Sequence, residues 1–126
     1  MRLLLDTHVV LWWLADDDRL GAGARAAIGS AGTAAAVSAA SAWEMSIKAA
    51  SGKLRLPAGL DSHLGEQGFD ELPVTVADGL AAGALPRHHD DPFDRMLIAQ
   101  ARRRDLTVVT ADARFEDYDV RLLPAR

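Results

Sequence analysis

Residues 91–112 read D-P-F-D-R-M-L-I-A-Q-A-R-R-R-D-L-T-V-V-T-A-D and contain the clearest helix and the clearest strand of the chain. Asp91 followed by Pro92 is typical of a helix start, with Asp91 as N-cap and the proline in the first turn. Three arginines at 102–104 close the helix, where its dipole favours positive charge. The β-branched run Leu106–Thr110 then predicts a buried strand. A helix that leads directly into such a strand indicates an α/β fold.

The rest of the chain repeats this alternation on the N-terminal side and once more at the C-terminus. Further strands are predicted over Arg2–Asp6, Thr33–Ala39, Glu71–Val74 and Val120–Leu123, the last at a sheet edge. Further helices are predicted over Val9–Ala15, Gly21–Ile28, Ser41–Ala50, Leu60–Gln67 and Val76–Leu85. Strands separated by helices imply a mostly parallel sheet, here of about four or five strands.

Length and composition indicate one globular domain over residues 1–126. Hydrophobic residues make up 49% of the chain and charged residues 25%, which argues against disorder. No apolar run reaches the roughly 18 residues that cross a bilayer, and Asp6 interrupts the first apolar stretch too early for a signal peptide. We therefore expect a cytoplasmic protein with no membrane segment. The absence of cysteine excludes disulfides and thiolate metal sites.

The net charge of −4 argues at first sight against a nucleic-acid partner. An ordinary acidic domain would have the same charge. Carboxylates gathered around a cation would also lower the net charge, yet the local field would attract phosphate once the metal is bound. The positions of the acids therefore matter more than their number.

Four acids far apart in the sequence are expected at one edge of the sheet. Asp6 and Asp112 follow predicted strands, and Glu44 and Asp94 lie in the first turns of predicted helices. Ligands of open parallel sheets bind at this carboxyl edge. Two carboxylates about 5 Å apart repel by about 3 kcal/mol at an effective dielectric constant of about 20, so a cluster favours a cation or protonation. Oxygen ligands indicate Mg²⁺ or Mn²⁺, which can activate water to cleave a phosphodiester bond.

Each acid also has a structural interpretation. Asp6 and Asp112 could be N-caps of the helices that follow them. Ser41-Ala42-Trp43-Glu44 has the pattern of a capping box, and Glu44 could pair with Lys48 one turn later. Asp94 would be stabilised in the first turn of any helix. The convergence of the four acids, rather than any one of them, therefore indicates a metal site.

The histidines and tryptophans favour structural roles. We interpret His88 and His89 as part of a polar loop, because adjacent side chains rarely point at one metal. Tryptophans belong in the core by default. The consecutive Trp12 and Trp13 cannot both face one core, so one of them is expected in an interface with another protein chain.

Several motifs together resemble the PIN-domain toxins called VapC. They are M-R-L-L-L-D-T-H-V-V-L-W-W-L, S-A-A-S-A-W-E-M-S-I-K, H-H-D-D-P-F-D-R-M-L-I-A-Q-A and V-V-T-A-D-A-R-F, in family order over nearly the whole chain. The resemblance implies a three-layer α/β/α fold and an Mg²⁺-dependent endoribonuclease, with Mn²⁺ as a possible substitute. It also implies the toxin of a toxin–antitoxin pair, a homodimer neutralised by a small VapB-like antitoxin.

The resemblance also assigns site residues, position by position. The family's acidic quartet falls on Asp6, Glu44, Asp94 and Asp112. Asp6 and Asp94 would be the principal metal ligands, and the other two would complete the shell directly or through water. Thr110 would orient the nucleophilic water or a neighbouring acid.

Basic residues near the quartet are the expected contacts for an RNA backbone. Arg95, directly after Asp94, is the best single candidate, and Arg87 and Arg102–Arg104 are weaker ones. Asp90 departs from the family pattern, since members often carry a basic residue before D-P-F-D-R. This departure should weaken phosphate attraction at the edge of the site.

Two other functions are considered. A phosphoacceptor receiver domain also clusters aspartates around Mg²⁺, but it needs paired acids after the first strand, an aspartate after the third and a lysine after the fifth. Here Asp6 stands alone, Thr75 follows Val74, and lysine occurs only at positions 48 and 53. The other alternative is a catalytically silent PIN-like module that only binds a partner, and the presence of all four acids argues against it.

Overall fold

The computed structural model describes residues 1–126 and contains the strands and helices expected from the sequence. The strands are β1 (Arg2–Leu5), β2 (Ala34–Ser38), β3 (Asp70–Leu72), β4 (Thr107–Thr110) and β5 (Leu122–Pro124). The helices are α1 (Thr7–Leu14), α2 (Ala22–Gly29), α3 (Ala39–Ala50), α4 (Leu60–Glu66), α5 (Val76–Ala84), α6 (Pro92–Arg104) and the 3₁₀ helix η1 (Ala113–Asp117). None of these helices is long and apolar enough to cross a membrane.

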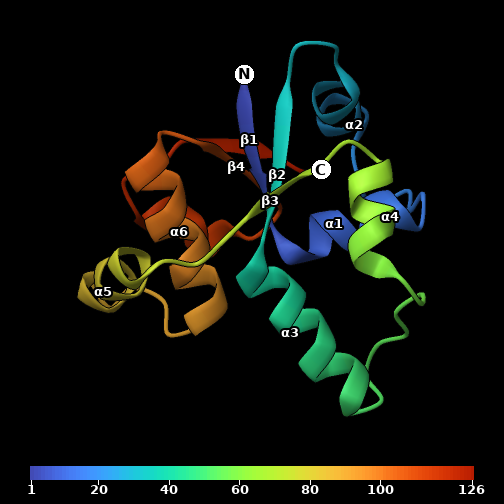
Figure 1. Ribbon diagram of the computed structural model, residues 1–126. Coiled ribbons are helices and arrows are strands. Elements are labelled where there is room, and N and C mark those ends of the chain that lie inside the picture. Colours follow the sequence, from blue (N-terminus) through green and yellow to red (C-terminus); the bar gives the residue numbers. More distant parts are fainter.

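The five strands form one sheet in the order β3-β2-β1-β4-β5, and every neighbouring pair is parallel. Helices α5 and α6 lie on one side of the sheet, and α1, α2 and α4 lie on the other (Figure 1). The expected three-layer α/β/α fold, its parallel sheet and the edge position of the last strand are all confirmed.

The central strand β1 explains why the chain begins with an unbroken apolar run. Successive side chains of a strand point to opposite faces. Leu3 and Leu5 therefore enter the core beneath α1 and α2, while Leu4 enters the core beneath α6. Val109 and Val108 of β4 divide between the same two cores. A parallel strand covered on both faces needs apolar residues at every position, which is what the sequence provides.

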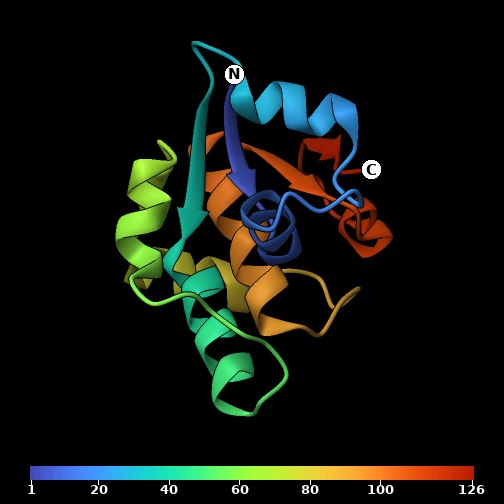
Figure 2. The same ribbon diagram turned by 90° about the vertical axis from the view of Figure 1, so that its right-hand side faces the viewer.

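Parallel strands direct the starts of several helices to one edge of the sheet. β1 runs directly into α1, and β2 runs directly into α3. Helix α6 precedes β4 and runs back along the sheet, so its first turn lies at this same carboxyl edge (Figure 2). The residues just after these strands and in the first turn of α6 are therefore brought together.

The start of α3 differs from the capping box expected at Ser41. The helix begins at Ala39, and its N-cap is Ser38, whose side chain accepts a hydrogen bond from the Ala40 amide at 3.1 Å. Strand β2 ends immediately before this cap, so the helix starts one turn earlier than the pattern suggested. Ser41 is buried, and its hydroxyl has no hydrogen-bond partner. Glu44 consequently lies in the second turn and does not cap the helix.

The premise that Trp12 and Trp13 cannot both face one core is wrong. Both pack against the same core, because α1 is enclosed on more than one side. The Trp13 ring meets Phe69 edge to face at 5.8 Å between centroids and donates a hydrogen bond to Gln67 at 3.1 Å. The exposed tryptophan is instead Trp43 on α3, with 64% of its surface accessible.

Candidate active site

The carboxyl edge of the sheet collects all four predicted acids. Asp6 follows β1 and caps α1, accepting a hydrogen bond from the His8 amide at 3.4 Å. Asp94 lies in the first turn of α6, after the N-cap Asp91. Asp112 follows β4 and caps η1. The side chain of Glu44 reaches this edge from α3, where its carboxylate accepts a hydrogen bond from Thr7 of α1 at 2.7 Å.

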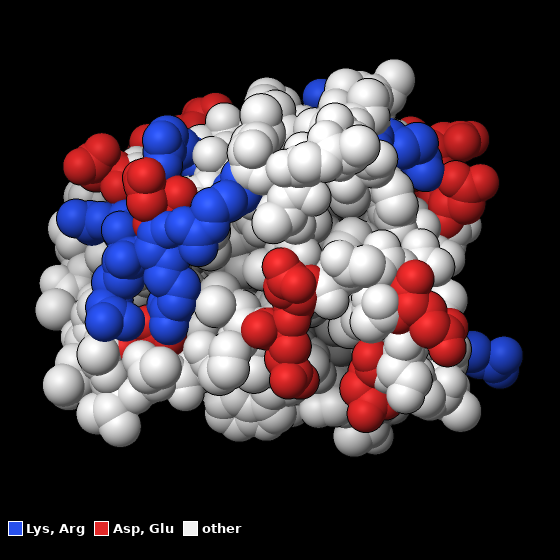
Figure 3. All heavy atoms as spheres, turned by 45° about the horizontal axis from the view of Figure 1, so that its top comes forward, with Lys and Arg blue, Asp and Glu red and all other residues white.

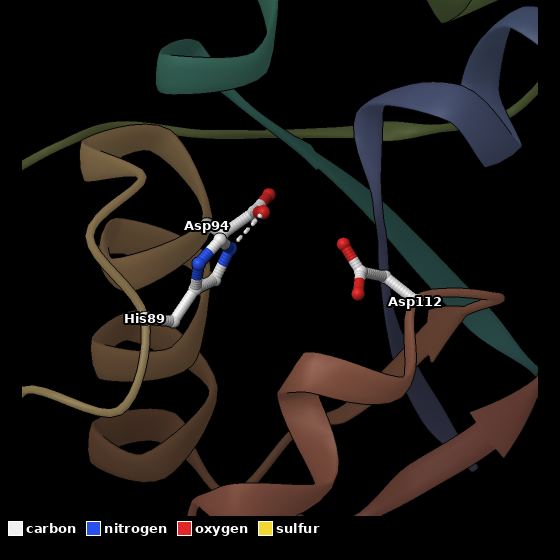
Figure 4. Close-up of side chains that lie close together, drawn as sticks. All are labelled: His89, Asp94 and Asp112. Atoms are coloured by element: carbon white, nitrogen blue, oxygen red, sulfur yellow. Dashed lines mark hydrogen bonds and ion pairs between the residues drawn. The ribbon is translucent and has the colours of Figure 1, made fainter.

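The group whose ligand atoms lie close enough together to hold one ion contains two of the predicted acids, Asp94 and Asp112, and a histidine. Candidate ligand atoms of His89, Asp94 and Asp112 all lie within 4.8 Å of one another. Figure 4 shows the imidazole beside Asp94 on the α6 side, with the Asp112 carboxylate facing them from the loop after β4. His89 Nε2 lies 2.7 Å from Asp94 Oδ2. These groups come from sequence positions far apart, and only the fold brings Asp112 to the other two.

Thr110 connects the ends of the two central strands. Its hydroxyl donates a hydrogen bond to Asp6 Oδ2 at 2.7 Å and accepts one from the Asp112 amide at 3.0 Å. The expected contact between Thr110 and a neighbouring acid is therefore present. This contact fixes the orientation of the Asp6 carboxylate, because the threonine itself is buried in β4.

Glu44 has a side-chain partner on each of its carboxylate oxygens. In addition to Thr7, its carboxylate pairs with Lys48 at 2.9 Å, so the expected i,i+4 ion pair is confirmed. Glu44 is nevertheless close enough to the centre for its charge to contribute to raising the pKa of Asp6. Glu44 therefore lies at the edge of the cluster, between the other acids and Lys48.

The innermost acids are short of positive charge. Burial raises the pKa of Asp6, although hydrogen bonds from Thr110 and His8 act against it. Burial likewise raises the pKa of Asp94 to about 6, opposed by the hydrogen bond with His89 and reinforced by the charge of Asp6. Carboxylates with raised pKa values are costly to ionise unless a cation joins them. Their oxygen atoms are the ligands that Mg²⁺ and Mn²⁺ prefer, so the residues fit a hard divalent cation.

Asp112 differs from the two inner acids. Arg114 holds both of its carboxylate oxygens, with the shortest contact at 2.7 Å, and this hydrogen bonding lowers the pKa of Asp112. The Arg114 side chain is 62% exposed, so the pair is at the surface of the site. A surface pair of this kind contributes little to stability and can open when a stronger cation binds.

His89 lies in the polar loop between α5 and α6, as expected, but its side chain is buried rather than exposed to solvent. Of the two adjacent histidines, His88 packs against the Tyr118 ring at 5.2 Å, while His89 is buried beside Asp94. The two side chains do point in different directions, as expected, but that of His89 points towards the acid cluster. The only signal in the sequence is the nearness of His89 to the start of α6, and that signal is weak.

The prediction that Arg95 contacts RNA is not supported by its surroundings. Its guanidinium donates hydrogen bonds to the carbonyls of Ala82 and Leu85 at 2.9 Å and of Pro86 at 3.0 Å. These carbonyls belong to the end of α5 and the loop after it, where main-chain acceptors lack helical partners. Arg95 therefore closes the end of α5 and is occupied by the main chain.

The arginine run at 102–104 lies at the wrong end of α6 for contacts near the acids. The helix has 13 residues, which separates its two ends by about 18 Å. Arg103 and Arg104 instead form ion pairs with the buried Asp78 of α5. The face shown in Figure 3 carries a group of basic side chains with acidic side chains beside it.

Comparisons with known proteins identify a family and a relative that match most of the chain. The family model described as PIN domain matches residues 3–121. Ribonuclease VapC22 of Mycobacterium tuberculosis is 33% identical over 119 residues, covering 92% of this chain and 91% of that protein. Both matches are based on the amino-acid sequence, so they are independent of the geometry described above.

Solved structures with the same fold are also known. VapBC2 from Rickettsia felis bound to a promoter DNA fragment matches with a TM-score of 0.71 and 13% identity, over 98% of both chains. A toxin–antitoxin complex from Klebsiella pneumoniae matches with a TM-score of 0.70 and 13% identity, over 98% of both chains. FitAcB from Neisseria gonorrhoeae matches with a TM-score of 0.67 and 22% identity, over 98% of this chain and 97% of that one. At these identities the likeness establishes the fold alone.

Proposed function

The chain belongs to the PIN-domain family, with a VapC ribonuclease among its relatives, and we propose that it is a metal-dependent endoribonuclease that acts as a toxin. The observation that carries this proposal is the carboxyl-edge cluster. There, burial raises the pKa values of Asp6 and Asp94, and no lysine or arginine pairs with either carboxylate. Such a cluster is expected to take up a divalent cation.

The residues divide the chemistry between them. Asp6 and Asp94 would hold Mg²⁺, for which Mn²⁺ could substitute, and Asp112 and Glu44 would complete the shell directly or through water. A metal held there would supply an activated water for in-line attack and would neutralise charge on the phosphoryl oxygens. Thr110 keeps Asp6 in a fixed orientation, through the hydrogen bond between their side chains. The products are a 5′-phosphate and a 3′-hydroxyl.

Partners follow from the toxin role. A VapB-like antitoxin would neutralise the chain, as toxin–antitoxin complexes are among the solved structures with this fold. The chain would form a homodimer and act on RNA in the cytoplasm. Exposed large apolar side chains are available for protein contacts on two helices, Trp43 and Ile47 on α3 and Val76 and Leu80 on α5.

Induced expression in a bacterial host tests the proposal. The chain alone should arrest growth and generate new 5′-phosphate RNA ends, mapped after brief induction. Asp6→Asn should abolish both effects and leave the fold intact, because the amide is isosteric with the acid but a poor ligand. Asp18→Asn serves as a matched control, since Asp18 is an exposed acid away from the cluster. Equal toxicity and cleavage by the Asp6→Asn variant would refute the mechanism, and tolerance of the active chain would refute the toxin role alone.

A further inference from the structure

His89 lies in a loop, but its side chain is buried and contacts Asp94. Its ring is 4% exposed, and Nε2 lies 2.7 Å from Asp94 Oδ2, within hydrogen-bond distance. The loop that carries it joins α5 to α6 and ends at the N-cap Asp91. In Figure 4 the ring lies alongside Asp94, and the Asp112 carboxylate faces this pair across the site.

The main chain around His89 is fixed from two sides. The Tyr118 hydroxyl accepts a hydrogen bond from the His89 amide at 3.0 Å and donates one to the Pro86 carbonyl at 2.7 Å. Arg95 donates a hydrogen bond to the His89 carbonyl at 3.2 Å. Tyr118 is itself buried in the core beneath α6, so the loop is tied to the interior of the protein. These contacts hold the imidazole at a defined position relative to the first turn of α6.

A carboxylate beside a metal site can rotate between orientations, and only some of them direct an oxygen to the metal. A hydrogen bond from Nε2–H of His89 to Oδ2 of the ionised Asp94 removes that freedom and leaves Oδ1 available to a metal ion. Hydrogen-bond partners of metal ligands orient them in this way, and their loss weakens metal binding by about 10- to 100-fold. The other carboxylate of the pair, Asp6, has a comparable partner in Thr110.

We propose that His89 is a positioning residue that holds the Asp94 carboxylate for a divalent cation through its Nε2–H donor. This inference rests on the proposed metal-dependent function, and it adds a residue that the acidic quartet does not contain. Because His89 acts through Asp94, it need not touch RNA or the metal. Each of the two principal metal ligands then has a hydrogen-bond partner that fixes its orientation: Thr110 for Asp6 and His89 for Asp94.

Binding of Mn²⁺ to the metal-free protein, followed by the electron paramagnetic resonance signal of free Mn²⁺, tests this role. His89→Leu removes the donor and keeps an apolar group of similar bulk, so affinity should fall by about 10- to 100-fold. His89→Gln places an amide N–H at about the reach of Nε2, so affinity should stay within about threefold of the original protein. His88→Leu is the matched control and should leave affinity unchanged. Thermal unfolding of each variant checks that it is folded.

The outcomes separate this inference from the proposed function. Unchanged affinity in His89→Leu would overturn the positioning role. An equal loss in folded His89→Gln would also overturn it, because the imidazole would then be a ligand itself. If His89→Leu does not fold, His89→Asn replaces it: the amide is one methylene too short, and the same loss is expected. Normal Mn²⁺ binding with no RNA cleavage would refute the nuclease and leave the positioning role intact, whereas no Mn²⁺ binding by the original protein would refute both.

Discussion

Two buried carboxylates lie against opposite ends of α6, and their surroundings are opposite. At the end of the helix, Asp78 is completely buried, and Arg104 holds it at 2.8 Å with Arg103 beside it. The hydrogen bond from Arg104, with others from Thr75, Arg103 and Gln100, lowers the pKa of Asp78. At the start of the helix, burial raises the pKa of Asp94 to about 6, and its only side-chain partner is His89.

The comparison separates structural acids from functional ones. Both ends of α6 bury negative charge, and a buried charge must be compensated. At Asp78 the protein supplies the cations itself, so this site is complete and holds α5 against α6. At Asp94 the protein supplies other acids instead, so the compensating cation has to come from outside. A buried acid without a basic partner is therefore a better guide to function than acidity alone.

The largest expected effect is on catalysis. Asp94→Asn should reduce cleavage of a single-stranded RNA in Mg²⁺ by about a thousandfold or more, because loss of a principal metal ligand removes several kcal/mol of transition-state stabilisation. The cleavage rate per folded molecule measures this effect. Asp78→Asn is the control at the other end of the helix and should retain its rate. Comparable losses in both variants would remove the distinction between the two ends.

The next effect concerns stability at the Asp78 end. Asp78→Ala should lower the free energy of unfolding at pH 7 by about 3 kcal/mol, because two arginines lose a buried partner. Urea unfolding measures the change, and Mn²⁺ affinity should stay the same. The folded-state pKa of Asp78 is lowered, so its stabilisation is present above the unfolded pKa of about 4 and is lost as pH falls towards the folded value. The variant should accordingly lose less stability below pH 4 than the original chain.

A smaller effect of opposite sign is expected at the Asp94 end. The folded-state pKa of Asp94 is raised to about 6, so its contribution to stability is present below about pH 4 and is lost as pH rises through about 6. Asp94→Asn should therefore stabilise the metal-free protein at pH 8 by about 1 to 2 kcal/mol, with little difference near pH 4. Urea unfolding in a chelator measures this. Added Mn²⁺ should stabilise only the original protein, and a variant that is less stable at pH 8 would contradict the comparison.

Much of the fold was predictable because local patterns and tertiary packing agree. The D-P start and arginine-rich end of α6 gave its observed bounds, and the apolar runs of β1 and β4 gave the centre of the sheet. The placement of Asp6 and Asp112 after strands and of Asp94 in a first turn likewise follows from parallel topology. These features are determined by residues that are close together in the sequence, so they can be predicted without knowledge of the tertiary structure.

The features that were missed depend on contacts between distant residues. Ser38 and Ser41 are equally good caps, and the end of β2 decides between them. Arg95 follows an active-site acid, yet its guanidinium is occupied by carbonyls of α5. His89 enters the cluster because Tyr118, 29 residues later, fixes its loop. No periodicity or motif encodes these contacts, so they become visible only in the assembled fold.

The most direct test of the central claim is to locate a divalent cation by its anomalous X-ray scattering in crystals grown with Mn²⁺. We predict a peak coordinated by carboxylate oxygens of Asp94 and Asp6 at the carboxyl edge of the sheet, with His89 still bonded to Asp94 and no peak beside Asp78. The absence of any peak at the acid cluster, or a peak bound only elsewhere, would contradict the claim.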